Sequence, residues 1–430
     1  MATLLITVPD FTSHVLPILP IAAALVKRDH RVLVHTSQQH QDKVEAIGAE
    51  LVPMSEQCDI KFQTENCSVP RPWWFPAVAN GLWRFRHGVL AMVPVMMAEL
   101  ETIVKREQVD CLIGDYIGYG ASYAAERLGI PFITITVSWT VTPNADAVPS
   151  FLAALPLPPR LIHAAIDFIF PLRRVRQQMG LPPRPKSAPA EFISIIVSKL
   201  LNVVTAHRDF IPATDLQENQ VFIGPTAFQM PHASDDPYGA SLEPGTVLVS
   251  TTTSSTADDG QFRLVLESVA QMGFPVLATS GNATDIPSDL GENVRLETFV
   301  PFDQVLPYVK AMVTHGGAGS VGRAFRMGVP MLIISDFGDQ IATGSRAADL
   351  GLAYHLPKNK VTPKAIQSKL NALLQDQALH NRVKALSEQL RSMDSPELGA
   401  DAIERTLQHS MTRSAIQPTH AARLASTVSS

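Results

Sequence analysis

The sequence predicts an α/β fold made of two doubly wound, parallel-sheet domains. Short and nearly continuous apolar runs alternate with helical patterns over residues 3–137, and the same alternation returns over residues 246–356. Strands that are apolar on both faces are typical of parallel sheets covered by helices on both sides. The chain has 430 residues, of which 46% are hydrophobic and 17% charged, so it can build two cores of ordinary size.

The first half of the chain contains four apolar runs that we expect to be strands. They are TLLITV (3–8), RVLVHT (31–36), DCLIGD (110–115) and PFITITV (131–137). Helical patterns follow the first three runs, over residues 16–28, 38–48 and 119–129. The N-terminal run is short, lacks a basic flank and stops at a polar turn, which is typical of a first strand and not of a signal peptide.

The alternation lapses over residues 141–190, which are rich in Pro and aromatic residues, and then restarts. A helical pattern over residues 258–273 separates the first two apolar runs of the second half, and Thr362 before Pro363 predicts a further helix start. The apolar runs are TVLVSTTTSST (246–256), PVLATSG (275–281), NVRLETFV (293–300), AMVTH (311–315), PMLIIS (330–335) and LAYHL (352–356).

From these patterns we predict an N-terminal domain over residues 1–224, a linker over 225–245 and a C-terminal domain over 246–410. The last helix is expected to pack back on the N-terminal domain, and the small, polar residues 411–430 to form a flexible tail. In such sheets ligands bind beyond the carboxyl ends of the strands. Polar side chains follow several of the predicted strands, so the two domains are expected to face a cleft.

Charge and cysteine content exclude several classes of protein. The net charge is -5 and no basic tract occurs, which argues against nucleic acid as the main partner. Cys58, Cys67 and Cys111 are few and scattered, and fit neither a disulfide framework nor a zinc site, so we expect a cytoplasmic protein. No uncharged run approaches the ~20 residues that span a bilayer.

A glycine-rich stretch follows the apolar run that ends at His315. Gly316, Gly317 and Gly319 lie within four residues and are followed by Ser320 and a helical pattern. Free N–H groups and the dipole at a helix N-terminus bind anions, most often phosphate, where glycine lets the ligand approach the main chain. The alternative is that the glycines serve only helix–sheet packing.

The same stretch, GAGSVG at 317–322, also fits the G-x-G-x-x-G fingerprint of dinucleotide-binding domains. Asp336 follows the next apolar run at about the spacing that this fingerprint requires. The fingerprint usually lies in the first strand–helix unit, whereas here it lies in the second half of the chain. The glycines therefore indicate pyrophosphate binding without choosing between a dinucleotide and a nucleotide-sugar.

THGGAGSVGRAFRMGVP (314–330), followed by DFGDQ (336–340), resembles the donor-binding signature of nucleotide-sugar-dependent glycosyltransferases of the GT-B fold. The likeness is greatest to the macrolide-type bacterial enzymes and to the UDP-glycosyltransferases of plants and animals. VPDFTSHVLPILPIAAALVKRDHRV (8–32) is similar to the opening segment of the family, and VLVSTTTSS (247–255) to the start of its second domain.

The resemblance implies two Rossmann-like domains and an inverting glycosyltransferase, a monomer or homodimer. It would move a sugar from a nucleoside-diphosphate sugar to a hydroxyl of a lipophilic natural-product aglycone. UDP is the first expectation for the nucleotide, with dTDP or GDP as alternatives. No cofactor is expected.

The resemblance assigns the catalytic role to His14 and Asp115. A histidine suits a general base because its unperturbed pKa is near neutral. A carboxylate on the far ring nitrogen would fix the tautomer and stabilise the imidazolium. Read from the residues alone, His14 could instead be a capping or exposed histidine, and Asp115 the N-cap of the following helix.

The donor site implied by the resemblance lies in the second half. Asp339 and Gln340 would hold sugar hydroxyls, because an acid beside an amide offers both acceptors and donors. Their alternative is a helix N-cap followed by an exposed glutamine, and the alternative for the threonine- and serine-rich loop is local side-chain to backbone bonding. The diphosphate would be bound by Thr253, Ser254, His315, Gly317, Gly319 and Ser320.

Several positions depart from the pattern of the family. Phe299 and Phe302 stand in the segment that binds the base, where many relatives have Trp and Gln. Arg323 stands where plant members have a ribose-binding glutamate. Thr252 and Thr343 replace a common Gly and Asn, and these changes leave the nucleotide open.

Residues 71–97 and 149–174 are rich in aromatic residues and Met, and the resemblance places acceptor-binding segments there. We expect Trp73, Trp74, Trp83 and Trp139 to line an apolar acceptor pocket. The alternative is ordinary core helices, and contact with a membrane surface is a weaker one. No D-x-D triplet occurs, so no metal ion is expected on the diphosphate.

Two rival functions remain at this stage. An NAD- or FAD-dependent oxidoreductase would use GAGSVG at 317–322 but gives no role to His14 or to Asp339 and Gln340. A non-catalytic GT-B helper protein would explain the substituted positions but not the presence of His14 and Asp115.

Overall fold

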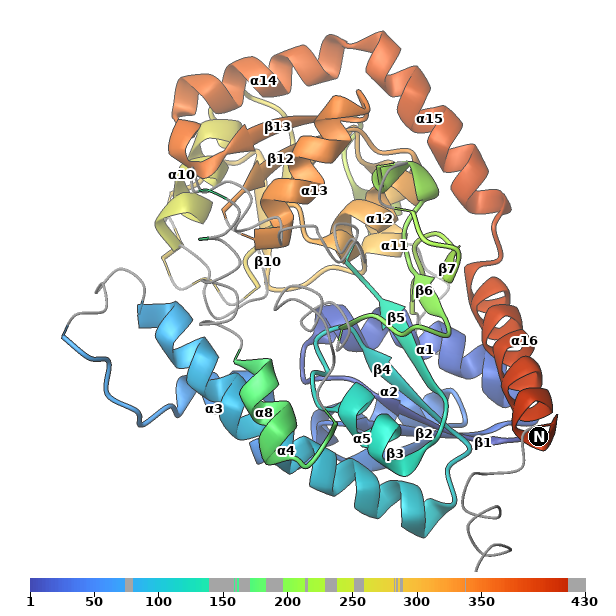
Figure 1. The fold of residues 1–430 in the computed structure, drawn as a ribbon. Helices are drawn as coiled ribbons and strands as arrows, with labels where there is room; N and C mark the ends of the chain where they lie inside the picture. Colours follow the sequence, from blue (N-terminus) through green and yellow to red (C-terminus); the bar gives the residue numbers. More distant parts are fainter. Residues whose placement is uncertain are drawn as a thin grey trace, which may run out of the picture.

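The computed structural model describes residues 1–73, 80–138, 158, 161, 171–182, 196–212, 216–228, 238–250, 259–281, 283, 285–286, 289–336 and 338–416. Its strands form two sheets, in the orders β3-β2-β1-β4-β5-β6-β7 and β10-β9-β8-β11-β12-β13. Every pair of neighbouring strands is parallel, which confirms the predicted α/β class with two doubly wound sheets. Figure 1 shows the second sheet and its helices above the first.

The strands of the first sheet are β1 (Thr3–Thr7), β2 (Arg31–Thr36), β3 (Glu50–Pro53), β4 (Cys111–Asp115), β5 (Phe132–Thr136), β6 (Asn202–Val204) and β7 (Gln220–Phe222). Those of the second are β8 (Val247–Ser250), β9 (Val276–Thr279), β10 (Val294–Glu297), β11 (Ala311–Thr314), β12 (Met331–Ser335) and β13 (Ala353–Pro357). Each apolar run predicted as a strand contains one. The sequence did not predict β3, β6 and β7, which have only three or four residues.

The helices associated with the first sheet are α1 (Thr12–Lys27), α2 (Gln41–Ala46), α3 (Ile60–Glu65), α4 (Asn80–Glu107), α5 (Ala121–Leu128) and α8 (Leu172–Gln178). Those that follow are α10 (Asp259–Ala270), α11 (Phe302–Val305), α12 (Ala318–Met327), α13 (Gly338–Asp349), α14 (Pro363–Gln375), α15 (Gln377–Ser392) and α16 (Ser395–Ile416). The predicted start of α14 is confirmed: Thr362 Oγ1 accepts a hydrogen bond from Ala365 N at 3.1 Å, and Pro363 is the first helical residue.

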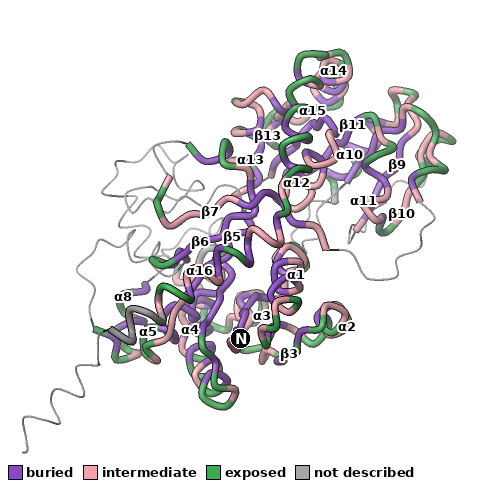
Figure 2. Tube along the Cα trace, turned by 90° about the vertical axis from the view of Figure 1, so that its right-hand side faces the viewer, coloured by how far each residue is buried: buried purple, intermediate pink, exposed green. Residues whose placement is uncertain are grey.

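The first sheet is covered on both faces because its side chains alternate between two apolar clusters. Leu5 joins one cluster together with residues of α4 and α5, whereas Leu4 and Ile6 join another with residues of α1 and α16. A third cluster forms the core around the second sheet. Figure 2 shows buried residues running through the strands, with exposed residues on the helices that cover them.

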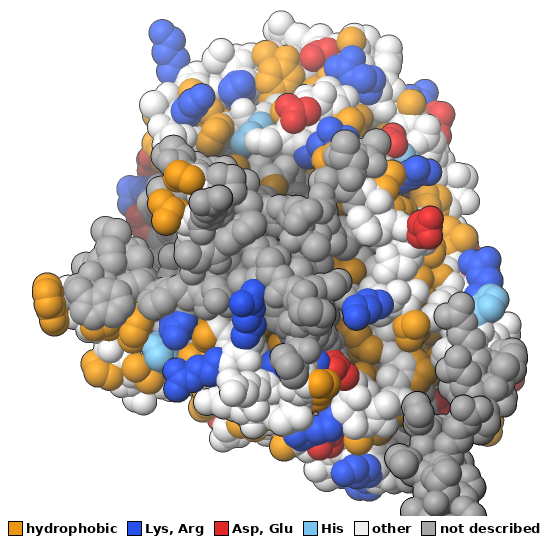
Figure 3. Space-filling model, in the orientation of Figure 1, with side chains coloured by type: hydrophobic (Ala, Val, Ile, Leu, Met, Phe, Trp, Pro, Cys, Tyr) orange, Lys and Arg blue, Asp and Glu red, His pale blue; other side chains and the backbone are white. Residues whose placement is uncertain are grey.

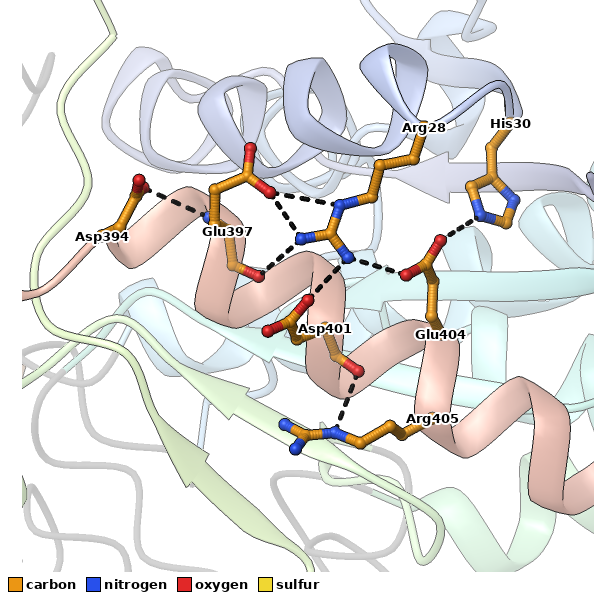
Figure 4. A network of polar contacts seen from close by, with 7 residues as sticks. All are labelled: Arg28, His30, Asp394, Glu397, Asp401, Glu404 and Arg405. Atoms are coloured by element: carbon orange, nitrogen blue, oxygen red, sulfur yellow. Dashed lines mark hydrogen bonds and ion pairs between the residues drawn. The ribbon is translucent and has the colours of Figure 1, made fainter.

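The helix α16 follows the second sheet in sequence but packs on the N-terminal half of the molecule. Ile403 is fully buried in the cluster that contains residues of α1, which contributes about 1.5–3 kcal/mol. Figure 4 shows Arg28, at the end of α1, paired with three acidic residues of α16: Glu397, Asp401 and Glu404. A cation beside the last carbonyls of α1 also complements the helix dipole.

The chain crosses between the two halves at two neighbouring places. Gly224 follows β7 with φ of 77°, and a Cβ there would lie 3.3 Å from Met393 Sδ and 3.3 Å from Ser395 Oγ, between α15 and α16. The first crossing therefore packs against the second. A glycine suits the position because it adopts positive φ at little cost.

Candidate active site between the two sheets

His14 lies in the first turn of α1, and its ring reaches the end of the neighbouring strand β4. Its Nδ1 is 3.1 Å from both carboxylate oxygens of Asp115. The parallel pairing of β1 with β4 brings the two residues together, because the turn after β1 and the last residue of β4 lie at the same edge of the sheet. His14 is 14% exposed at its side chain, so it is not the exposed histidine of the alternative reading.

Asp115 is buried and holds a second contact besides His14. Its Oδ1 accepts a hydrogen bond from Ile117 N at 2.9 Å, which closes the turn after β4. The next helix, α5, has Gly120 as its N-cap, so Asp115 does not cap it. The carboxylate is therefore held by the turn and aimed at the imidazole.

The electrostatic surroundings favour the protonated form of His14. Burial lowers the pKa of His14, but the charge and hydrogen bond of Asp115 raise it by more, and the charge of Asp339 adds to this rise. The net effect is a pKa above the ordinary value of 6.5. A histidine with a raised pKa binds a proton more tightly than an ordinary histidine. It is neutral, and so able to accept a proton, only at a pH above that raised pKa.

Asp339 comes from the other half of the molecule, in the first turn of α13. Its charge acts on His14, and burial raises the pKa of the Asp339 carboxyl while His14 lowers it. Gln340 beside it is buried, and its Oε1 accepts a hydrogen bond from Asp336 N at 3.2 Å. The structure thus brings Asp339 toward the His14–Asp115 pair, and Gln340 is not the exposed residue of the alternative reading.

The glycine-rich turn lies between β11 and α12 and has the geometry of an open helix start. Gly316 has φ of 94°, and Gly317 is the N-cap of α12 without a side-chain cap. A Cβ on Gly317 would lie 2.6 Å from His315 Nε2, whereas nothing lies within 4 Å of a Cβ on Gly319 among the described residues. Gly317 therefore leaves room for the His315 ring, and no described residue fills the space beside Gly319.

His315 carries a polar atom that has no partner among the described residues. Its Nδ1 is buried and makes no hydrogen bond to them, and burial lowers the pKa of the imidazole to about 4. A buried unpaired nitrogen costs about 1–3 kcal/mol, which a ligand could recover. Next to the free N–H groups of α12, a neutral imidazole can donate to an oxyanion.

The residues expected near the nucleotide are spread over α11, α12 and the loop before them. Phe299 is 76% exposed, while Phe302 is half-buried against the core of the second sheet, so Phe299 is the aromatic ring more open to a base. Arg323 lies on α12 with its Nη1 3.8 Å from Asp303 Oδ2. Ser320 is half-buried in the first turn of the same helix.

Part of the predicted site lies outside the described residues: Thr252, Thr253, Ser254, Trp74 and Trp139. Of the remaining acceptor candidates, Trp73 is 93% exposed. Trp83, in the first turn of α4, is half-buried and donates a hydrogen bond from Nε1 to the carbonyl of Val69 at 3.1 Å.

The Trp83–Glu107 segment is long and apolar enough to cross a membrane, but half of its most apolar 18-residue window is buried, as in a core helix.

Two aromatic residues beside His14 were not singled out in the sequence. Tyr116 and Phe11 both place their rings against His14, at centroid distances of 5.4 and 5.6 Å. The only signal for Tyr116 was its position directly after Asp115, and for Phe11 its position three residues before His14. Stacking depends on ring orientation, which sequence spacing does not reveal.

The surroundings of Asp336 differ from those expected for a dinucleotide site. Its Oδ1 is 2.7 Å from Lys358 Nζ, so the carboxylate is already paired with a cation. On the face drawn in Figure 3, basic and acidic side chains of the described residues are interspersed. Within the described part of the chain, no three His, Cys, Asp or Glu side chains gather so that they could hold a metal ion.

The sequence was compared with protein families and with individual proteins. The family model for the C-terminal domain of erythromycin biosynthesis protein CIII-like proteins matches residues 263–405. The 4'-demethylrebeccamycin synthase of Lentzea aerocolonigenes is 26% identical over 420 residues, which cover 94% of this chain and 99% of the relative. The NDP-glycosyltransferase YjiC of Bacillus subtilis is 23% identical over 412 residues, 94% of this chain and 97% of the relative.

Solved structures show the same fold over nearly the whole chain. The glycotransferase of kitacinnamycin has a TM-score of 0.71 at 24% identity, covering 94% of this chain and 99% of that one. Glycosyltransferase VinC in complex with dTDP has a TM-score of 0.63 at 18% identity, covering 95% of this chain and 100% of that one.

These findings confirm the family resemblance drawn from the glycine-rich motif and the opening segment. They do not support the oxidoreductase or the non-catalytic helper, since glycosyltransferases recur among both the relatives and the structural neighbours. The chain is a glycosyltransferase of the GT-B fold and is similar to the macrolide and UDP-glycosyltransferases.

Proposed function

We propose that this enzyme transfers a sugar from a nucleoside-diphosphate sugar to a hydroxyl of a lipophilic small molecule, with inversion at the anomeric carbon. The observation that carries the proposal is the contact between His14 Nδ1 and Asp115, at 3.1 Å, with the charge of Asp339 acting on the same ring from the other half. A base, its orienting carboxylate and a group that can bind sugar hydroxyls meet between the two sheets.

In the proposed reaction His14 Nε2 takes the proton of the acceptor hydroxyl. That nitrogen has no hydrogen-bond partner among the described residues, whereas Nδ1 is occupied by Asp115. The acceptor oxygen forms a bond to the anomeric carbon while the bond from that carbon to the diphosphate oxygen breaks. The nucleoside diphosphate leaves, and attack from the opposite face inverts the configuration.

The proposed site for the diphosphate is the turn between β11 and α12. The unpaired His315 Nδ1, the N–H groups at the start of α12 and the open space at Gly319 support this placement. Together with hydroxyls of Ser320, Thr253 and Ser254, they would stabilise the charge of the leaving group. The proposal therefore includes no metal ion, and activity should survive treatment with EDTA.

For the nucleotide we propose UDP first and dTDP as the alternative. Phe299 is exposed enough to stack on either base. Arg323 has no oxygen that could accept a hydrogen bond from ribose hydroxyls, but Asp303, whose Oδ2 lies 3.8 Å from Arg323 Nη1, is an acceptor in the same region. A structural neighbour, VinC, is described in complex with dTDP, which supports the alternative.

For the acceptor we propose a lipophilic aglycone bound near α4. The N-terminal part of this helix carries the half-buried Trp83, whose ring lies 4.5 Å from that of His87, so an aromatic surface is present there. The name of the relative 4'-demethylrebeccamycin synthase points to a small-molecule product and supports this class of acceptor.

Thermal unfolding with UDP-, dTDP- and GDP-sugars, and with NAD as a negative control, tests the proposal. A ligand present at 100 times its Kd stabilises the native state by about 2.7 kcal/mol, which raises Tm by several degrees. We expect UDP- or dTDP-sugars to raise Tm, in the wild type and equally in His14→Ala. Stabilisation by NAD alone, or by none of the sugars, would contradict the donor assignment, and NMR of the product would test inversion.

A further inference from the structure

The imidazole of His14 lies between two aromatic rings as well as against Asp115. The Tyr116 ring is stacked on it, with centroids 5.4 Å apart and an interplanar angle of 26°. The Phe11 ring lies 5.6 Å away and is tilted by 50°. We propose that Tyr116 is a positioning residue for His14, which holds the plane of the imidazole by stacking and stabilises its protonated form. This inference rests on the proposed role of His14 as the base.

Tyr116 is held in place from three directions. It follows Asp115 at the end of β4, in a turn closed by hydrogen bonds from Gly118 N to Asp115 O at 2.9 Å and from Ile117 N to Asp115 Oδ1. Its ring packs against the apolar clusters on both faces of the first sheet, and its hydroxyl is hydrogen-bonded to Ser138, which is buried. The same turn thus places the Asp115 carboxylate at the edge of the imidazole and the Tyr116 ring against its face.

The two contacts restrain different motions of the base. The carboxylate of Asp115 anchors Nδ1 but leaves the ring free to tilt about that anchor. A stacked ring limits the tilt, so that Nε2 keeps its direction. Aromatic pairs prefer such offset arrangements at centroid distances of about 4.5–7 Å.

Stacking also affects the charge that His14 carries after it takes a proton. The face of an aromatic ring attracts a cation that lies within about 6 Å of its centroid. Burial and the charges of Asp339 and Asp115 keep the pKa of Tyr116 well above its ordinary value, so the ring remains a neutral phenol. Among the described residues, the charged groups that act on His14 are Asp115 and Asp339, and Tyr116 adds a neutral aromatic ring beside them.

The experiment measures protonation of His14 directly, by NMR titration of the full-length enzyme with the signal assigned from His14→Gln. Tyr116→Leu keeps the apolar volume and burial but removes the ring, and should weaken proton binding by His14 about two- to fivefold. Tyr116→Phe keeps the ring and should leave His14 close to wild type. The matched control is Tyr354→Leu, which replaces a half-buried tyrosine on β13 and should leave the protonation of His14 unchanged.

The acid limb of the pH profile of kcat/KM is measured on the same variants. It should shift in the same direction as the pKa of His14 that the NMR titration gives. If the NMR titration moves but the profile does not, the stacking inference is supported while the role of His14 as base is contradicted. If Tyr116→Leu leaves the titration unchanged, or Tyr116→Phe moves it equally, the inference is overturned. Should Tyr116→Leu fail to fold, Tyr116→Met replaces it in both measurements.

Discussion

The two histidines on either side of this site have opposite surroundings. His14, on the first sheet's side, has Nδ1 3.1 Å from both oxygens of Asp115, and its pKa is raised. His315, on the second sheet's side, has a buried Nδ1 with no partner in the described part of the chain, and burial lowers its pKa to about 4. The described residues therefore complete the surroundings of His14 but give His315 Nδ1 no partner, as a site for a ligand would require.

The difference follows from what each histidine is proposed to do. A general base must keep one tautomer and one direction before the substrate arrives, so a protein carboxylate on its far nitrogen is an advantage. A group that binds a diphosphate needs an unused donor, because a protein acceptor already bonded to it would compete with the ligand. The unsatisfied nitrogen costs stability without the ligand and contributes to affinity with it.

The largest effect is expected from removing the base. His14→Ala should lower kcat by about 10²–10⁴-fold, since it removes the group proposed to take the acceptor proton, while donor binding persists. Steady-state kinetics and calorimetric titration of the donor measure the two properties. His409→Ala, on the exposed side of α16, is the control and should behave as wild type. Unchanged turnover in His14→Ala would refute the assignment of the base.

The second change removes the negative charge beside His14, so that His14, like His315, has no carboxylate partner among the described residues. Asp115→Asn should lower kcat/KM by about 10²-fold, because the amide neither stabilises the imidazolium nor selects the tautomer. In the wild type, activity should fall as the pH drops through a pKa above 6.5, because the raised pKa protonates the base earlier. In Asp115→Asn burial remains, so this acid limb should move to lower pH.

Pre-steady-state or steady-state pH profiles of both enzymes check this shift. An acid limb that stays in place in Asp115→Asn would show that another group controls it, and would break the contrast between the two histidines.

The third change tests whether the open space at the helix start belongs to a ligand. Gly319→Ala meets no described atom within 4 Å, and alanine favours a helix by about 0.5–1 kcal/mol, so stability should rise slightly. If the diphosphate approaches the main chain there, the added methyl group should weaken donor binding by about tenfold. Chemical denaturation and calorimetric titration separate the two effects. Gly273→Ala, in the turn after α10, serves as a control for donor binding.

A fourth, smaller effect concerns His315 itself. Because its pKa is lowered by burial, His315 is neutral above a pH of about 4 in the free enzyme. A bound diphosphate would place negative charge beside it, so binding UDP or dTDP should raise this pKa. NMR titration of His315 with and without the nucleotide measures the change. A signal that does not respond to a nucleotide that binds would place the diphosphate elsewhere.

Most of the architecture could be predicted from the sequence because parallel strands leave a strong local signal. The apolar runs around Ile6, Ile113 and Ile333 are buried from both sides, so each reads as continuous. The short strands β6 and β7 left no such signal. Their pairing is decided by neighbours far away in the chain, as when Val203 pairs with Ile135.

The glycines at 316, 317 and 319 predicted a helix start at which the main chain is accessible, because the effect of glycine is local: it has no Cβ and adopts positive φ at little cost. That His14, Asp115 and Asp339 belong to one site could be predicted only from the family resemblance, since these residues are far apart in sequence. Tyr116 was missed for a related reason, because stacking depends on the orientation of two rings.

By itself, the sequence determined the class of fold, the order of strands and helices along the chain and the bare turn at His315, because hydrophobic periodicity and glycine act within a few residues. Only the tertiary structure decided which side chains meet: the edge shared by β1 and β4 brings His14 to Asp115, and the return of α16 to α1 ties the two halves together. Contacts of that kind depend on the packing of whole elements, which no short stretch of sequence contains.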